Sequence, residues 1–226
     1  MRCQVSGMRR QVRGAMALAL AIAVWLVGTT AAAQQGPVVL DETIVSVNGD
    51  LVLKSDILWN LALDPAVSVP EFWQRDIQDM MLRTLIDQRL LLQEASKLPA
   101  TAVTDEEISA EVAVIRKRFE AQGDEIRLER RAEIVGLTDE RLRRIVRQRL
   151  RILKFVDFRF RSFVVVTEPE IVDYFETEVR PADPTAMLPA NRDRIQELLV
   201  EEKINASIDS FLENARARAD VIQLDE

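Results

Sequence analysis

The chain has 226 residues, of which 30% are charged, and its formal net charge is −7. It contains no histidine and one cysteine, which excludes a Ser–His–Asp triad, a Cys–His pair and a histidine-ligated metal centre. The acidic balance argues against a nucleic-acid partner. Seven glycines in the whole chain favour long helices over a many-turned β fold.

The first 33 residues have the composition of a secretory signal peptide. Arginines without any acidic residue precede an apolar run over 15–27, which is too short to cross a bilayer comfortably. Three alanines at 31–33 supply the small residues that a signal peptidase reads, so we predict cleavage after Ala33. The alternative is that the segment stays as a membrane anchor. Cleavage would remove Cys3 and no acidic residue, so the mature chain would lack thiols and be more acidic still.

One segment early in the mature chain predicts β structure. Branched and apolar residues flank Asn48–Gly49 over 43–53 (TIVSVNGDLVL). Asn-Gly accepts the positive φ angles of a type I′ turn, which predicts a two-stranded hairpin. Because an isolated hairpin is marginally stable in water, it needs helices or a third strand beside it. Residues 219–224 (ADVIQL) are the candidate third strand.

The segment over 80–98 carries the strongest helical pattern. After a short helix over 55–63, Pro70 opens a long helix that ends before Pro99. Its apolar residues cover more than half of the circumference, which predicts a central helix with neighbours on several sides. Arg89 falls inside the apolar arc, so it either extends its charge to solvent or meets a carboxylate.

Four further helices are predicted over 105–121, 125–135, 139–160 and 168–175. Their starts carry capping signals, with Ser/Thr-x-x-Glu boxes at 104–107 and 167–170 and a capping Thr138. The outer face of the helix over 139–160 is basic. Such a face is more often solvated than bound to nucleic acid or acidic lipid.

The composition changes near residue 180. Three prolines within 180–189 predict a linker, and the apolar stripe that follows predicts one long helix. We therefore divide the mature chain, 34–226, into N-terminal helices over 54–178, a connector over 179–190 and a C-terminal helix over 191–218.

No pattern in the sequence predicts an active site, a cofactor or a metal. A Gly-rich phosphate loop is missing, and the acidic residues at 105–107 stand at a helix start, where capping and the helix dipole explain them. The bulky aromatics are instead candidates for an apolar cradle that binds extended segments of other proteins. These candidates are Trp59, Phe72, Trp73 and Phe119. The alternative is that they pack in the core, as large aromatics usually do.

Six stretches, in this order, resemble the chaperone module of SurA-type periplasmic proteins, and more loosely PpiD and trigger factor. They are IVSVNGDLVLKSDI, LIDQRLLLQEASKL, VTDEEISAEVAVI, GLTDERLRRIVRQRLRILKFVDFRFR, VVVTEPEIVDYFE and IQELLVEEKINASIDSFLENARARADVIQL. Together they cover nearly the whole mature chain. The family commonly carries parvulin-type prolyl isomerase domains between the helix that contains YFE and the C-terminal helix. Here only residues 176–190 intervene, too few for such a domain, so isomerase activity is not carried over.

The resemblance implies a mostly α-helical chaperone core with a small N-terminal hairpin, joined by a C-terminal strand. It also implies that the C-terminal helix packs back on the N-terminal helices. The expected function is ATP-independent holding of unfolded secreted or outer-membrane proteins in the periplasm, without nucleic acid, small-molecule substrate or cofactor. A membrane is a partner only if the signal segment is retained. The alternative is a structural or assembly adaptor of the envelope that binds one folded partner.

Overall fold

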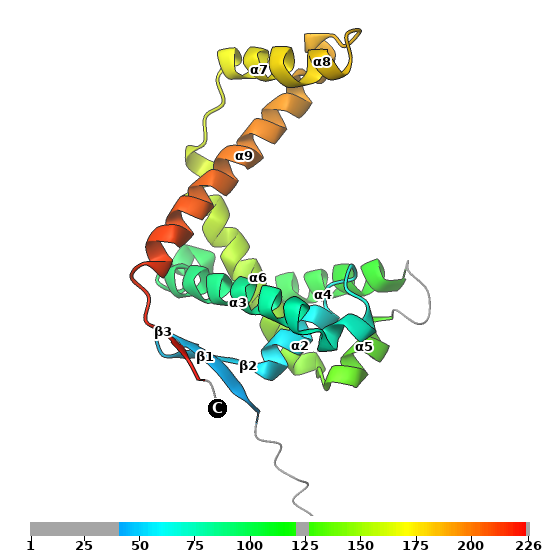
Figure 1. Ribbon diagram of the computed structural model, residues 1–226, viewed down its shortest axis with the longest axis vertical. Coiled ribbons are helices and arrows are strands. Elements are labelled where there is room, and N and C mark those ends of the chain that lie inside the picture. The colour runs from blue at the N-terminus through cyan, green and yellow to red at the C-terminus, as the bar shows by residue number, and fades with distance from the viewer. Residues whose placement is uncertain (1–40, 121–126, 225–226) are drawn as a thin grey trace, which may run out of the picture. The chain divides into compact units, whose positions relative to one another are not determined.

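The computed structural model describes residues 41–120 and 127–224, so the predicted signal peptide over 1–33 lies outside the described residues. Within these ranges the chain is mostly α-helical, with a small three-stranded antiparallel sheet (Figure 1). This confirms the predicted fold class. The helices of eight or more residues are α2 (Lys54–Ala62), α3 (Arg75–Ser96), α4 (Asp105–Glu120), α5 (Leu128–Val135), α6 (Asp139–Arg159) and α9 (Leu188–Arg216). The shorter helical elements are η1 (Val69–Trp73), η2 (Pro99–Thr101), η4 (Arg161–Phe163), α7 (Glu168–Tyr174), the π-helix η5 (Phe175–Val179) and α8 (Arg180–Ala182).

The predicted hairpin is present as β1 (Thr43–Val47) and β2 (Asp50–Leu53), which pair antiparallel. Its turn residues, Asn48 and Gly49, have φ angles of 52° and 89°. These positive values are what a type I′ turn requires, and Asn and Gly tolerate them best. The turn therefore follows from local sequence alone.

The predicted third strand, β3 (Val221–Gln223), pairs antiparallel with β1 and gives the strand order β2-β1-β3. Asn48 holds this strand at its start. The Asn48 backbone N–H donates to the carbonyl of Asp220, and its side-chain oxygen accepts from the Asp220 N–H, both at 2.8 Å. The C-terminal strand thus completes the sheet that the N-terminal hairpin begins.

The long helix predicted from Pro70 is divided in the structure. Residues Val69–Trp73 form the 3₁₀ turn η1, Gln74 is extended, and α3 begins at Arg75. Ser68 and Glu71 form a capping box at the start of the short turn. The backbone N–H groups there have partners within the turn, so the turn does not need to continue into α3. As predicted, α3 is central, because it contacts β1, β2, α2, α6 and α9.

The predicted connector over 179–190 is wrong in most of its length. The chain stays helical through η5 and α8 to Ala182, and α9 begins at Leu188 with Pro189 in its first turn. Proline is accepted at the start of a helix because the N–H it lacks has no partner there. Of the three prolines that suggested a linker, Pro189 therefore opens a helix, while Pro181 lies near the end of the helical run that continues from η5.

Buried apolar side chains of the described residues form three clusters. The first joins the sheet and α3 to Ile204 and Leu212 of α9, the second joins α2, α4, α5 and α6, and the third joins α7 and η5 to Ile195 of α9. An ion pair between Arg216 and Asp87, with oxygens at 2.6 and 2.7 Å, also links α9 to α3. The C-terminal helix therefore does contact the leucine-rich helix. In the described ranges no helix combines the length and apolar character needed to span a membrane.

The contact between α7 and α9 predicts a pH dependence. Hydrogen bonds from Lys203 on α9 and from Thr167 at the start of α7 lower the pKa of the Glu170 carboxyl to about 2. Because the folded chain favours the carboxylate, the stabilisation is present above the unfolded pKa near 4.5 and is lost as the pH falls toward 2. We expect the Glu170 carboxyl carbon to titrate near pH 2 by NMR, with Glu170→Gln assigning the signal. A midpoint near 4.5 would show that the contact with Lys203 is absent in solution.

Candidate functional site

Three of the four aromatics predicted to form a cradle are in the core. Phe72, Phe119 and Trp59 are 0%, 1% and 8% exposed. The Trp59 indole N–H donates to the backbone carbonyl of Val135 at 3.1 Å, which satisfies its polar atom inside the structure. The prediction of an accessible cradle is wrong for these three residues, because neighbouring helices cover the apolar surface that the sequence pattern showed. The core alternative holds for them.

Trp73, the fourth candidate, is 58% exposed at the end of η1. It follows the fully buried Phe72, and consecutive residues of a 3₁₀ turn point in different directions. Of the four candidates, Trp73 is therefore the only one on the surface. It lines none of the clefts described below.

Phe72 and Phe119 enclose a buried arginine that the sequence analysis did not single out. The Arg131 guanidinium carbon lies 4.8 Å from the centre of the Phe72 ring and 5.3 Å from that of Phe119. Its nitrogens donate to the carbonyls of Leu61, Ala62 and Asp64 at 2.7–2.9 Å. These carbonyls belong to the last turn of α2 and the residues after it, where intrahelical donors run out.

Arg131 is thus a cap for the C-terminus of α2, supplied by α5. Burial lowers the pKa of its guanidinium, and the charge of Asp64 partly opposes this change. A signal in the sequence was available, because Arg131 lies three residues after Leu128 and four before Val135, on the apolar stripe of its helix. In the structure, Arg131 stabilises the contact between α5 and α2.

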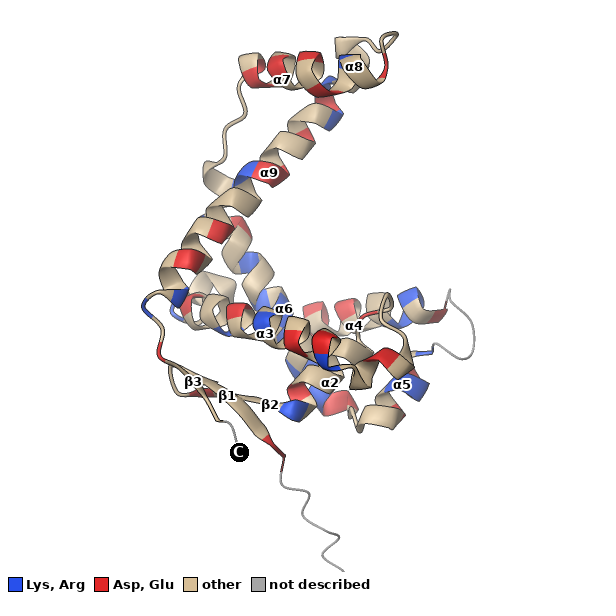
Figure 2. Ribbon diagram, viewed as in Figure 1, with Lys and Arg blue, Asp and Glu red and all other residues tan. Residues whose placement is uncertain are grey.

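Three residues of the basic face of α6 contact α4. Arg147 contacts Asp105 at 3.1 Å and Lys154 contacts Glu107 at 2.8 Å, while Arg143 donates to the hydroxyl of Ser109. The hydrogen bond from Lys154 is the main cause that lowers the pKa of Glu107. Figure 2 shows the basic residues along α6 and the acidic residues of α4. Two acidic residues at the start of α4 therefore each pair with a cation of this face.

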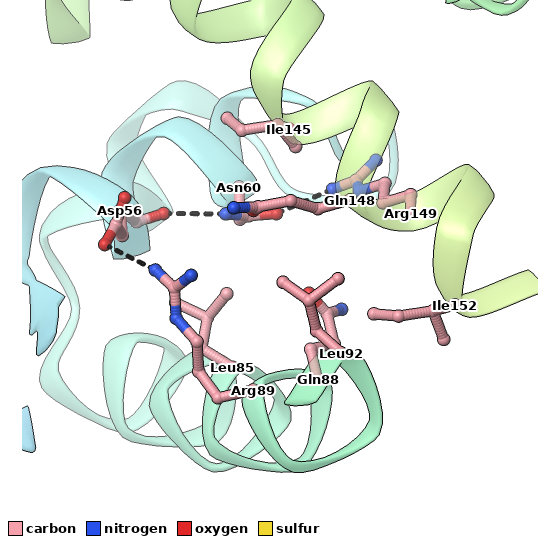
Figure 3. Close-up of a pocket in the computed structure, with 10 residues that line it drawn as sticks. All are labelled: Asp56, Asn60, Leu85, Gln88, Arg89, Leu92, Ile145, Gln148, Arg149 and Ile152. Atoms are coloured by element: carbon pink, nitrogen blue, oxygen red, sulfur yellow. Dashed lines mark hydrogen bonds and ion pairs between the residues drawn. The ribbon is translucent and has the colours of Figure 1, made fainter. Parts of the chain in front are cut away.

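A small polar cavity lies among α2, α3 and α6 (Figure 3). Arg89 meets the carboxylate of Asp56 at 3.2 Å, which is one of the two alternatives that the sequence left open. Arg149 donates to the side-chain oxygen of Asn60 at 2.8 Å, and burial lowers the pKa of its guanidinium. The cavity holds about 20 Å³, which suits about one water molecule. The cavity is part of the packing between these helices and is too small to bind a polypeptide.

A candidate binding site is a cleft between the end of α6 and α9. Its volume is about 640 Å³, within the range of ligand-binding clefts. The end of α6, η4 and Val164 form one wall, and the α9 residues from Ala206 onward form the other. We call this space the α6–α9 cleft.

Aromatic contacts hold the two walls of the cleft together. Phe155 and Phe160 of the α6 end each meet Phe211 of α9 edge to face, with ring centres 6.0 and 5.8 Å apart. Phe155 and Phe160 also meet each other at 5.9 Å. Such edge-to-face pairs are favoured by the ring quadrupoles. An ion pair between Arg161 and Glu201 at 2.9 Å adds a second contact between the walls.

The lining of the cleft combines accessible apolar surface with uncharged polar groups. Phe163 of η4 lines it and is 74% exposed, while Phe160 beneath is 7% exposed. On α9 the lining includes Ser207, Ser210 and Asn214, whose side chains can pair with the backbone of a bound segment. Sequence analysis missed Phe163, because nothing in its pattern distinguishes an uncovered aromatic from a buried one.

A second cleft shares part of its lining with the α6–α9 cleft. This neighbour holds about 280 Å³ and is lined by residues of α3, by Asn48 and by the end of α9. Phe211 and Arg218 line both spaces. The two clefts therefore lie next to each other along α9.

Comparisons with known proteins found no family model that matches the chain and no curated protein with significant similarity. Within residues 41–120 and 127–224, no group of three or more acidic, histidine or cysteine residues is placed to hold a metal ion. What can be argued about function therefore comes from the cleft and from the residues that line it.

Proposed function

We propose that this protein is an ATP-independent holding chaperone of the periplasm that binds unfolded secreted or outer-membrane proteins, without prolyl isomerase activity. The observation that carries the proposal is the α6–α9 cleft. The exposed Phe163 lines it together with Phe160 and Phe211, whose rings are in contact. Accessible apolar surface in an open cleft suits weak binding of apolar segments. The ordered resemblance to SurA-type proteins supports the same class, and the predicted signal peptide over 1–33 supports the location.

The mechanism is binding of the unfolded state. A protein that binds unfolded chains lowers their free concentration, and this slows aggregation without any change in the client's covalent structure. Abundant charges around the cleft, such as those of Arg161 and Glu201, keep the apolar surface from associating with itself. The binding residues proposed here replace the buried aromatics of the sequence prediction.

The test is suppression of aggregation by the mature chain. We expect it to keep several unrelated denatured proteins soluble at near-stoichiometric ratios without ATP. An envelope adaptor would fail this assay and would instead yield a single tight partner on pull-down. Acceleration of proline isomerisation in a test peptide would contradict the proposal that the chain lacks this activity.

A paired substitution tests the position of the site. We expect Phe163→Ser to reduce suppression of aggregation at least severalfold, because it removes the exposed aromatic of the cleft. Since Phe163 is largely exposed, the urea midpoint of this variant should stay close to that of the unmodified chain. Trp73→Ser is the matched control, an exposed aromatic outside the cleft. Loss of activity in Trp73→Ser, with none in Phe163→Ser, would place the site at η1 instead.

A further inference from the structure

Two arginines of the α6–α9 cleft differ from most cations near them. Arg159, at the end of α6, and Arg218, just after α9, both line the cleft, and neither has a carboxylate partner among the described residues. By contrast, Lys154, Arg161 and Arg216 are each paired with an acid. Other exposed arginines of the described residues, such as Arg75 and Arg83, also lack a carboxylate partner, but Arg159 and Arg218 are the two that line this cleft.

The cleft offers these cations no internal partner. Its lining contains aromatic, aliphatic, hydroxyl and amide side chains and, besides the two arginines, no charged residue. The neighbouring space adds one acid, Glu94, which is already paired with Lys97 at 2.7 Å. A bound chain is therefore the natural source of negative charge at this position.

Both arginines are held so that part of each guanidinium stays available. Arg159 lies over the ring of Phe160, with 5.8 Å from its guanidinium carbon to the ring centre. Arg218 donates through Nε to the carbonyl of Asn214 at 3.1 Å, which leaves its two terminal nitrogens for another acceptor. A guanidinium with free terminal nitrogens matches a carboxylate in a two-point contact.

We propose that the α6–α9 cleft selects unfolded segments in which an apolar or aromatic residue is followed or preceded, within a few positions, by an aspartate or glutamate. The inference rests on the proposed function and specifies the class of segment that the cleft holds. The aromatic side chain packs on Phe163 and Phe211, and the carboxylate pairs with Arg159 or Arg218. Charge-assisted hydrogen bonds are about twice as strong as neutral ones, so they decide between segments of equal apolar content.

The experiment compares three labelled peptides of equal length and equal aromatic content by fluorescence anisotropy. One carries aspartates beside the aromatics, one has asparagine in their place, and one has lysine. We expect the mature chain to bind the aspartate peptide about tenfold more tightly than the asparagine peptide, equivalent to ~1.4 kcal/mol, and the lysine peptide most weakly. The difference should shrink with added salt, since exposed charges are screened.

Substitutions assign the preference to the two arginines. In the double variant Arg159→Gln/Arg218→Gln we expect the preference to fall to within about twofold, while affinity for the asparagine peptide is unchanged. The control is Arg83→Gln/Arg130→Gln, which makes the same change in net charge at exposed positions outside the cleft and should keep the preference. All four side chains are on the surface, so the circular dichroism spectrum and urea midpoint should match the unmodified chain.

The outcomes separate this inference from the proposed function. Equal binding of all three peptides, or tighter binding of the lysine peptide, would overturn the inference and leave the holding function standing. A preference for the aspartate peptide that persists in Arg159→Gln/Arg218→Gln would also overturn the inference, because other residues would then bind the carboxylates. If none of the peptides binds and aggregation is not suppressed, the proposed function itself fails.

Discussion

Replacing Arg131 by methionine should destabilise the protein by about 3 kcal/mol or more, measured as a fall in the urea midpoint. The guanidinium donates to three carbonyls at the end of α2 and lies between two phenylalanine rings. Methionine keeps much of the apolar volume but leaves these carbonyls without donors. Each buried acceptor left unsatisfied costs roughly 1–3 kcal/mol, which sets the expected size of the effect.

The adjacent arginine provides the control for this substitution. Arg130 is exposed and makes a surface ion pair with Glu133 at 2.9 Å, and such pairs contribute little to stability. We expect Arg130→Met to leave the urea midpoint nearly unchanged. If Arg131→Met behaved in the same way, the carbonyls would have to be hydrated, and α5 would not be capping α2.

Replacing Trp59 by alanine should cost about 3–5 kcal/mol, as is typical for removal of a buried tryptophan. The indole packs in the second core cluster with Leu63 and Val146, and its N–H donates to the carbonyl of Val135. The substitution leaves a cavity and an unsatisfied carbonyl. We expect the urea midpoint to fall and the slope of the transition to stay unchanged. Unfolding is monitored by far-ultraviolet circular dichroism.

Trp73→Ala is the matched comparison, because the same side chain is 58% exposed there. Its urea midpoint should stay close to that of the unmodified chain. Equal destabilisation by the two substitutions would show that Trp73 is covered in solution. The pair also separates folding from binding, since a loss of client binding in Trp59→Ala would follow from loss of structure.

The candidate site could not be predicted from the sequence, although the types of residue in it could. Aromatic residues were expected to bind unfolded segments, yet Phe72 and Phe119 are buried and Phe163 is exposed. Phe72 and Phe163 each have one apolar neighbour in the sequence, although one is buried and the other exposed. Whether such a residue is covered depends on which helix packs over it, and that contact joins positions far apart in the chain.

Local order, by contrast, was readable from short stretches of sequence. The turn at Asn48–Gly49, the cap at Thr138 and the end of α5 at Gly136, where φ is 65°, all lie where the sequence predicts them. Each depends on backbone geometry and on hydrogen bonds within about four residues. The exceptions were prolines, since Pro189 stands in the first turn of α9, where proline is as acceptable as in a loop, and Pro181 lies near the end of a helical run.

Periodicity and capping act over short distances, so the mostly helical fold, the hairpin, the C-terminal strand and most of the helix boundaries follow from local sequence. The tertiary structure alone decided that Arg131 is a buried cap, that three candidate aromatics are core residues, and that α6 and α9 enclose a cleft with two unpaired arginines. Burial and charge pairing are properties of contacts between distant segments, and a periodic pattern shows which side of a helix is apolar but not what covers it.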